Sequence, residues 1–201
     1  MIAVIDYDAG NMKSVEKAFQ YLGEDVCITR DRKKIMSADK VVLPGVGAFG
    51  DAMERLKKYD LVETIKGAVS DGKPFLGICL GLQLLFDRSD EAPGVEGLGI
   101  LKGSILRIPA QEGLKIPHMG WNNVKLMKES RIFHDLGENP YFSFVHSYYL
   151  KADKPEDVAA VTYYGTKIDA AVEHENVFAS QFHPEKSSRT GLRILRNFAQ
   201  L

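Results

Sequence analysis

Cys79 is the residue of this sequence best placed to act as a nucleophile. It stands in Gly77-Ile78-Cys79-Leu80-Gly81, a Gly-x-nucleophile-x-Gly pattern with cysteine as the central residue. An apolar run precedes it and a helical pattern follows, which is the strand–turn–helix context of a nucleophile elbow. A helix start favours the thiolate, and we expect the backbone N–H of Leu80 to be free to hold an oxyanion. Taken alone, the pattern is equally compatible with a small buried cysteine between packing glycines.

A nucleophilic thiol needs a base, and His183 has the most suitable neighbours of the five histidines. Pro184 favours extended backbone at His183, and residues two apart on an extended segment point to the same side. The carboxylate of Glu185 can therefore orient the imidazole and complete a Cys-His-Glu triad. The competing interpretation is a His-Pro turn with a solvated glutamate. His146 and His118 are weaker base candidates.

A glycine-rich segment, 43–50, closes an apolar strand with the letters LPGVGAFG. It has neither the Lys-Ser/Thr pair of a P-loop nor GxGxxG spacing, which disfavours nucleotide binding. Its backbone N–H groups are candidates to hold an oxyanion beside Cys79. The alternative is an ordinary loop with conformational glycines.

The elements that position these residues alternate between strand and helix in the first half of the chain. Strands are predicted at 2–6, 26–29, 40–43 and 75–78, and helices at 12–22, 49–58, 61–70 and 82–88. Such alternation implies parallel crossovers and a sheet covered on both faces. From 99 to about 182, short alternating runs predict antiparallel strands, and a last helix is expected over 188–199. We therefore predict one α/β domain over 1–201, an open, mostly parallel sheet flanked by helices with an antiparallel, β-rich second half.

The composition excludes several classes of function. The chain has 201 residues, with 26 basic against 27 acidic residues and a net charge of −1, which argues against nucleic acid or an anionic membrane as the main partner. Two cysteines, Cys27 and Cys79, cannot form a disulfide framework or a four-ligand zinc site, and no metal or cofactor is expected. The longest uncharged run, 74–86, is too short to span a bilayer, and the chain opens on a strand rather than a signal peptide. These features predict a cytoplasmic protein with reduced thiols.

The segments GICLGLQLLF (77–86) and QFHPE (181–185) resemble those of the class I, or triad, glutamine amidotransferases, as do the Cys-then-His order and the separation of 104 residues. Within that family, the order of LPGVGAFG, EAPGVEGLGIL, IPHMGWN, FVHSY and QFHPEKS is most similar to the glutaminase subunits of imidazole glycerol phosphate synthases of histidine biosynthesis. The resemblance covers essentially the whole chain, and IPHMGWN is its most discriminating segment. The family often reads Asp-Tyr-Gly-x-Gly-Asn where this chain has Asp8 at the third place, in a loop expected near the partner.

The resemblance implies specific roles. Cys79 attacks the side-chain carboxamide of L-glutamine to form a γ-glutamyl thioester, His183 moves the protons and Glu185 holds the imidazole. The implied oxyanion donors are the N–H of Leu80 and that of Val46 or Gly47. The implied substrate-holding residues are Gln83, Ser147 and Tyr148, and the implied interface or gating residues are Asn11, Trp121, Asn122 and Lys186.

The resemblance also implies a partner, a (βα)₈-barrel cyclase subunit in a heterodimer. It receives the ammonia and converts the nucleotide PRFAR into imidazole glycerol phosphate and AICAR. The alternatives are a glutaminase of another pathway, such as anthranilate or aminodeoxychorismate synthase, a free-standing thiol hydrolase, and a regulatory module with a dead triad. IPHMGWN and Lys186 disfavour the first alternative, and the complete triad disfavours the last.

Overall fold

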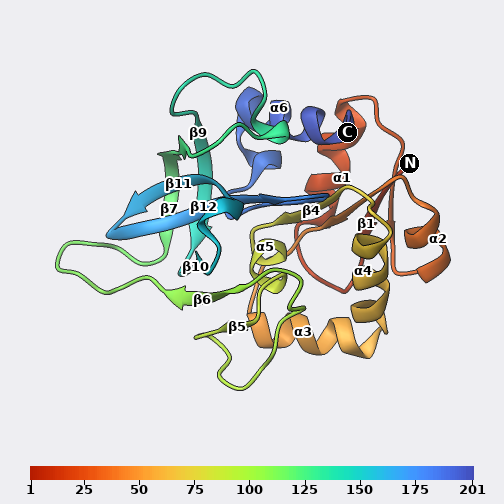
Figure 1. Ribbon diagram of the computed structural model, residues 1–201, viewed down its shortest axis with the longest axis horizontal. Helices are drawn as coiled ribbons and strands as arrows, with labels where there is room; N and C mark the ends of the chain where they lie inside the picture. The colour runs from red at the N-terminus through yellow and green to blue at the C-terminus, as the bar shows by residue number, and fades with distance from the viewer.

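An eight-stranded sheet forms the centre of the protein in a computed structural model that describes residues 1–201 (Figure 1). In spatial order its strands are β2 (Val26–Thr29), β1 (Ile2–Ile5), β3 (Lys40–Leu43), β4 (Phe75–Ile78), β13 (Val177–Ser180), β12 (Thr166–His174), β11 (Val158–Tyr164) and β8 (Lys125–Leu126). The first five strands are parallel to one another, and antiparallel pairings add the last three. The expected open, mostly parallel sheet is confirmed.

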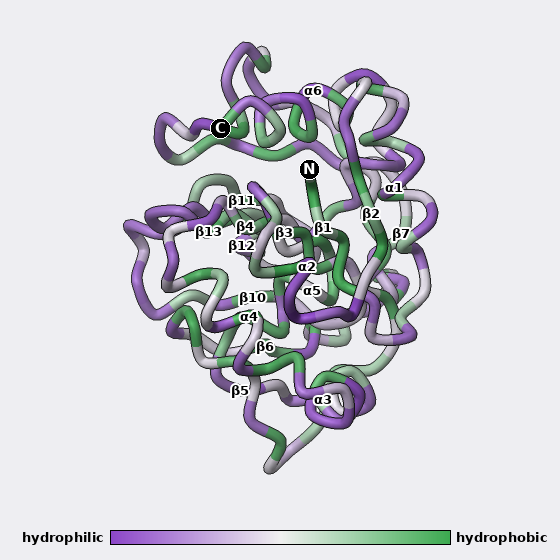
Figure 2. The backbone as a smooth tube through the Cα atoms, turned by 90° about the vertical axis from the view of Figure 1, so that its right-hand side faces the viewer, coloured by the Kyte–Doolittle hydropathy of each residue, from purple (hydrophilic) through white to green (hydrophobic).

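Helices cover both faces of this sheet, because its strands are apolar on both sides. On one face lie α1 (Met12–Tyr21) and α6 (Ser188–Ala199), and on the other lie α2 (Arg32–Ser37), α3 (Phe49–Lys58), α4 (Leu61–Ser70) and α5 (Leu80–Leu84). In β1, Ala3 and Ile5 are buried in one core cluster, whereas Ile2 and Val4 are buried in the other. The tube is green along these central strands and purple over most outer loops (Figure 2). No helix combines the length and the apolar character needed to cross a membrane.

Two smaller sheets contain the remaining five strands. One contains β10 (Tyr148–Ala152), β6 (Gly103–Arg107) and β5 (Arg88–Ser89), and the other contains β7 (His118–Asn123) and β9 (Tyr141–His146). Three short 3-10 helices, η1 (Arg131–Phe133), η2 (Pro155–Asp157) and η3 (Pro184–Lys186), connect strands and helices. The expected β-rich second half is confirmed, except that β13 also pairs with β4 in parallel and so extends the first half's sheet.

Two local predictions differ from the structure. The helix expected over 82–88 is α5, which begins at Leu80 and ends at Leu84. It ends there because the carbonyls of Leu84 and Leu85 accept hydrogen bonds from the N–H groups of Leu98 and Ile100, at 2.8 and 2.9 Å. The second difference is α2, which the periodicity does not reveal because its six residues bury only Ile35. Its start is stabilised by the side chain of Asp31, which caps two backbone N–H groups.

Candidate active site

The candidate site lies where the loops after β1, β3, β4 and β13 converge at the carboxyl ends of these parallel strands, a common place for ligand sites in open α/β sheets. The N–H of Cys79, just beyond β4, donates to the carbonyl of Ser180 at the end of β13 at 2.7 Å. Three residues later the same segment reaches His183. The pairing of β4 with β13 therefore brings together two motifs that lie far apart in the sequence.

The turn at Cys79 is tight and strained. Cys79 has φ 56° and ψ −107°, in the range of φ that side chains other than glycine rarely adopt. The helix α5 starts at the next residue, as a nucleophile elbow requires. Gly81 is needed for close approach, since a Cβ there would lie 1.8 Å from the carbonyl oxygen of Leu43. The predicted elbow is therefore present, with a thiol that is buried but lines a cavity.

His183 and Glu185 lie beside the thiol as a buried pair. Nδ1 of His183 is 2.8 Å from Oε1 of Glu185, and neither side chain is exposed. The same carboxylate oxygen accepts a hydrogen bond from Nδ2 of Asn11 at 2.7 Å. Nε2 of His183 has no hydrogen-bond partner in the structure, so it remains available to exchange a proton with Cys79. The geometry matches a base held by an orienting carboxylate.

The three buried histidines near the site have pKa values shifted in different directions. For His183, burial opposes the charged form, but the thiol of Cys79 and the carboxylate of Glu185 outweigh it and raise its pKa above the ordinary value. His118 and His146 have no carboxylate partner, and burial lowers their pKa values to about 4 and about 3. At neutral pH, His183 can therefore hold a proton, whereas the other two histidines are neutral.

These pKa shifts predict that the protein loses stability as the pH falls from 6.5 to 5. Unfolding restores His118 and His146 to an ordinary pKa of 6.5, so the unfolded state takes up protons that the folded state refuses. His183 opposes this decline, because its raised pKa keeps it protonated in the folded state while the unfolded state is still taking up its proton, but one histidine does not outweigh two. Urea unfolding at pH 7, 6 and 5 should show this decline, with a shallower decline in His118→Phe. Equal declines in the two proteins would contradict the shift at His118.

A cavity of about 360 Å³ opens beside Cys79. It is lined by Val46, Gly47, Cys79, Leu80, Gln83, Glu91, Val145, His146, Ser147 and Tyr148. The lining includes the sequence-predicted residues Gln83, Ser147 and Tyr148, so the structure brings them to the nucleophile. A larger cavity of about 1080 Å³, between the 126–134 segment and α6, contains none of these residues and lies apart from the triad.

Two residues near the nucleophile were missed by the sequence analysis. Nε2 of Gln181 is 3.6 Å from the sulfur of Cys79, and its Oε1 accepts a hydrogen bond from Gln83 at 3.0 Å. Glu91 is the one acidic residue of the cavity lining, and its carboxylate also accepts the N–H of Phe49 at 2.8 Å. The position of Gln181 two residues before His183 was an available signal. Nothing local to Glu91 predicts that its loop folds over the pocket.

The expected oxyanion donors differ in their availability. The prediction that the N–H of Leu80 is free is wrong for this conformation, because that N–H donates to the carbonyl of Gly45 at 3.3 Å. The N–H groups of Val46 and Gly47 donate to no protein group, and both residues line the cavity. This approach requires glycine at position 45, because a Cβ there would lie 2.1 Å from the hydroxyl oxygen of Tyr7. That hydroxyl donates to the carbonyl of Pro44 at 2.8 Å and so holds the 44–47 segment close to the elbow.

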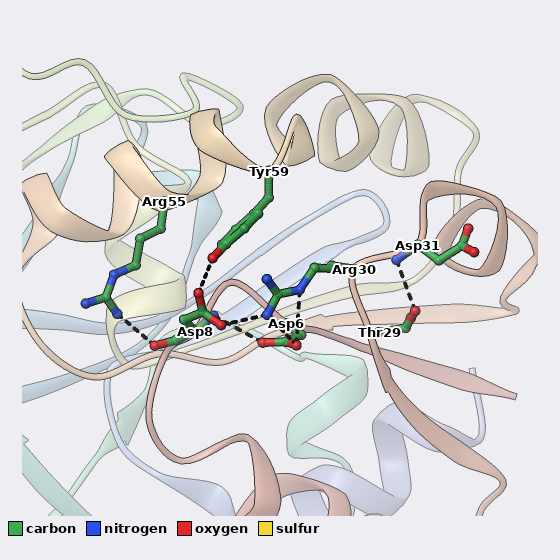
Figure 3. A network of polar contacts seen from close by, with 7 residues as sticks. All are labelled: Asp6, Asp8, Thr29, Arg30, Asp31, Arg55 and Tyr59. Atoms are coloured by element: carbon green, nitrogen blue, oxygen red, sulfur yellow. Dashed lines mark hydrogen bonds and ion pairs between the residues drawn. The ribbon is translucent and has the colours of Figure 1, made fainter.

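The backbone conformation and hydrogen bonds of Asp8 explain why the loop after β1 accepts an aspartate where the family often has glycine. Its φ is 59°, a left-handed value that aspartate adopts more readily than most residues. Its carboxylate accepts a hydrogen bond from Arg30 at 2.6 Å and one from the hydroxyl of Tyr59, and Arg30 also binds Asp6 at 2.7 Å (Figure 3). The hydroxyl of Tyr59 and the guanidinium of Arg30 lower the pKa of Asp8. This network anchors the loop that carries Asn11.

The four residues expected at a partner interface fall into two pairs. Trp121 and Lys186 are exposed and available to a partner. Asn11 and Asn122 are half-buried, and their amides bind groups of the same chain, the triad for Asn11 and the carbonyl of Tyr163 for Asn122. The structure therefore brings Asn11 to the triad rather than leaving it at the surface.

Comparison with known proteins agrees with this geometry. The model of the family "Glutamine amidotransferase class-I" matches residues 3–201. The chain is 49% identical to imidazole glycerol phosphate synthase subunit HisH of Methanothermobacter thermautotrophicus, covering 100% of this chain and 98% of the relative. It is 47% identical to the subunit of that name from Methanocaldococcus jannaschii, covering all of both chains.

Solved structures show the same fold at lower identity. The chain superposes on one in the structure of PurLQS from Thermotoga maritima with a TM-score of 0.78 and 20% identity, over 99% of this chain and 97% of that one. At this identity the likeness establishes the fold alone, whereas the full-length relatives near half identity establish the family. The chain belongs to the class I glutamine amidotransferases, in the family of imidazole glycerol phosphate synthase HisH subunits.

Proposed function

We propose that this protein hydrolyses L-glutamine to L-glutamate and ammonia with a triad of Cys79, His183 and Glu185. The observation that carries the proposal is the pairing of a strained cysteine elbow with a buried His-Glu pair whose free ring nitrogen has no other partner. Membership of an amidotransferase family supports glutamine as the substrate. The reaction needs no metal or cofactor, since thiol, base and oxyanion donors all come from this chain.

The reaction proceeds in two halves. Nε2 of His183 holds the proton given up by the thiol, as its raised pKa favours, and the sulfur of Cys79 bonds to the carboxamide carbon of glutamine. His183 then gives that proton to the leaving amine, so ammonia departs and a γ-glutamyl thioester remains. In the second half, His183 takes a proton from water, the hydroxide attacks the thioester, and glutamate leaves as the thiol is restored. Glu185 orients the imidazole and stabilises its charged form.

The same cavity accommodates the amino-acid head group of the substrate. Gln83, Ser147 and Tyr148 hold glutamine there through polar side-chain and backbone groups. Glu91 supplies a negative charge for the α-ammonium group of the substrate. With the head group held there, the carboxamide of glutamine can reach Cys79, which lines the same cavity.

A partner subunit receives the ammonia, because ammonia released to water is protonated and lost. Met119, Trp121, Tyr141 and Val145 are exposed on the β7–β9 pair, and Val145 also lines the cavity. An exposed apolar patch next to a catalytic pocket is typical of a docking surface. We propose that it binds a (βα)₈-barrel cyclase in a cytoplasmic heterodimer, with Asn11, Trp121, Asn122 and Lys186 at or near the contact.

The complete reaction is then the conversion of PRFAR into imidazole glycerol phosphate and AICAR, in histidine biosynthesis. The relatives' name as subunits of imidazole glycerol phosphate synthase supports this assignment. The motifs of the site come from residues 6 to 185, and α6 packs its apolar residues into the core beside the central sheet. We therefore treat 1–201 as one functional domain.

The isolated chain is expected to hydrolyse glutamine at least about 10²-fold more slowly than the complex with its partner and nucleotide ligand. In the resting structure the carbonyl of Gly45 occupies the N–H of Leu80, and one oxyanion donor is worth about 10²- to 10³-fold in rate. Turning the peptide after Gly45 would free that N–H, and glycines on both sides of Val46 make such a turn inexpensive. Glutamate release measured with and without partner and ligand tests the proposed function.

Val46→Pro provides a control for the switching step, because proline removes the N–H at position 46. We expect this variant to bind the partner normally but to be stimulated poorly. Equal turnover by the isolated chain and the loaded complex would show a preformed site and exclude a switching role for the 44–47 segment. No turnover in either form would exclude the glutaminase itself.

A further inference from the structure

A continuous chain of hydrogen bonds, buried at its centre and part-buried at both ends, runs from β7 to the glutamine pocket outside the triad. Nδ2 of Asn122 is 3.3 Å from Nε2 of His118, and Nδ1 of His118 is 2.9 Å from Nε2 of His146. Nδ1 of His146 is 2.8 Å from the backbone carbonyl oxygen of Tyr148. The ring of His118 is stacked between Phe144 and Tyr164, with centroids 4.8 and 4.0 Å away. None of the catalytic steps above uses these two histidines.

The direction of every proton in this chain follows from its two ends. The carbonyl of Tyr148 only accepts, so Nδ1 of His146 donates to it, and Nε2 of the neutral ring accepts from Nδ1–H of His118. At the other end, Oδ1 of Asn122 accepts the N–H of Asn123 at 2.9 Å, so its Nδ2 must face His118 and donate. Both ends therefore require the same arrangement, with each ring protonated on Nδ1 alone.

A second proton on either ring would break the chain. Protonated His118 would direct Nε2–H at the NH₂ group of Asn122, and protonated His146 would direct Nε2–H at the Nδ1–H of His118. The groups in contact with the two rings, which include Phe144, Tyr164, His183 and the carbonyl of Tyr148, carry no carboxylate. Burial, which lowers both pKa values, agrees with two neutral rings.

The chain ends on the corner that holds the substrate. Ser147 lies between β9 and β10, Tyr148 is the first residue of β10, and both line the cavity. The carbonyl of Tyr148 accepts from His146 and also from Nε2 of Gln83 at 3.1 Å, so both of its lone pairs are used. The orientation of this peptide group is therefore set by the two side chains. At its other end, Asn122 is the neighbour of the exposed Trp121 in β7.

We propose that Asn122, His118 and His146 form a positioning relay that holds the Ser147–Tyr148 corner in its glutamine-binding conformation. The inference rests on the proposed function, because it assigns the corner to glutamine. The relay touches neither the thiol nor the leaving group, so its loss affects glutamine affinity rather than the chemical steps. Because it begins beside Trp121, a partner that docks on β7 acts on glutamine binding through the same three side chains.

Two substitutions of His118 separate this role from a merely structural one. His118→Phe keeps an aromatic ring between Phe144 and Tyr164 but leaves Nε2 of His146 without a donor. His118→Asn loses the stacked ring but places an amide NH₂ near the former Nδ1, so it can still donate to His146. We expect the phenylalanine variant to unfold at a higher urea concentration than the asparagine variant, yet to bind glutamine more weakly.

The measurements use the full chain saturated with its partner subunit. His118→Phe is expected to raise the KM for glutamine roughly ten-fold, the effect of leaving one buried acceptor unpaired, with kcat within about two-fold of the parent. His118→Asn is expected to stay close to the parent KM, and His134→Phe, at an exposed histidine, serves as the control. A KM that follows the order of stability, or a kcat that falls with an unchanged KM, would overturn the relay.

Two readouts separate failure of the relay from failure of the proposed function. Nitrogen-15 NMR of the resting chain should show Nδ1–H and bare Nε2 on both rings at pH 7, and an Nε2–H on either ring would overturn the relay whatever the activity. Calorimetric binding of glutamine in a Cys79→Ala background should reproduce the ten-fold effect of His118→Phe. If glutamine binds but is never hydrolysed, the proposed function fails and the relay stands. If glutamine does not bind at all, both are wrong.

Discussion

Cys79→Ala is expected to reduce glutamine hydrolysis below detection while leaving the fold intact. Without the sulfur no thioester can form, and no other thiol lies in the cavity. The backbone bonds of the elbow are retained, because the N–H at position 79 still donates to Ser180 and alanine fits the space of the thiol. Glutamate release by the complex, together with the urea unfolding midpoint, measures both halves of this prediction. Synthesis driven by added ammonia should persist in the partner subunit.

Cys27→Ala is the matched control, because Cys27 is the other free cysteine of the chain. It lies in β2, where burial raises the pKa of its thiol and makes it a poorer nucleophile at neutral pH. A diazo-ketone analogue of glutamine should therefore label Cys79 and spare Cys27. Labelling chiefly at Cys27, or full hydrolysis by Cys79→Ala, would show that the nucleophile has been misassigned.

His183→Asn is expected to lower kcat for glutamine hydrolysis by about 10⁴-fold or more. The asparagine amide can still donate to Glu185 in place of Nδ1–H, so the buried carboxylate keeps a partner. No group then replaces Nε2, so neither thiol activation nor protonation of the leaving amine can occur. Steady-state turnover of the complex, with labelling of Cys79 as a separate measure of thiol reactivity, tests both consequences.

His174 offers a control of the same chemistry away from the site. Its Nδ1 is 2.8 Å from Oδ1 of Asp157, the distance found in the His183–Glu185 pair, but no thiol lies next to it. His174→Asn should leave turnover unchanged, and Glu185→Gln should cost less than His183→Asn because Glu185 only orients the base. If His146→Ala slowed the chemical step as much as His183→Asn, the base would have been assigned to the wrong histidine.

Much of the fold follows from local patterns in the sequence. Burial on both sides makes β1, β3 and β4 continuous apolar runs, and the spacing of apolar residues at 12, 15, 19 and 22 identifies α1. The elbow is equally local, since Gly77 and Gly81 flank Cys79 within five residues. The link between His183 and Glu185 follows from extended backbone across a proline. Each of these features is encoded within a single helix or a few residues of strand.

The assembly of the site was decided by the tertiary structure. Only the pairing of β4 with β13 brings His183 to Cys79, and only the approach of the 44–47 segment places the carbonyl of Gly45 on the N–H of Leu80. The helix after Cys79 is short because N–H groups of a later segment, 98–101, donate hydrogen bonds to the carbonyls at its end. His118 and His146 become neutral partners through the pairing of β7 with β9. These contacts join residues far apart in the chain, and the free energy that selects them comes from burial and from satisfied hydrogen bonds in the folded state, which local periodicity does not encode.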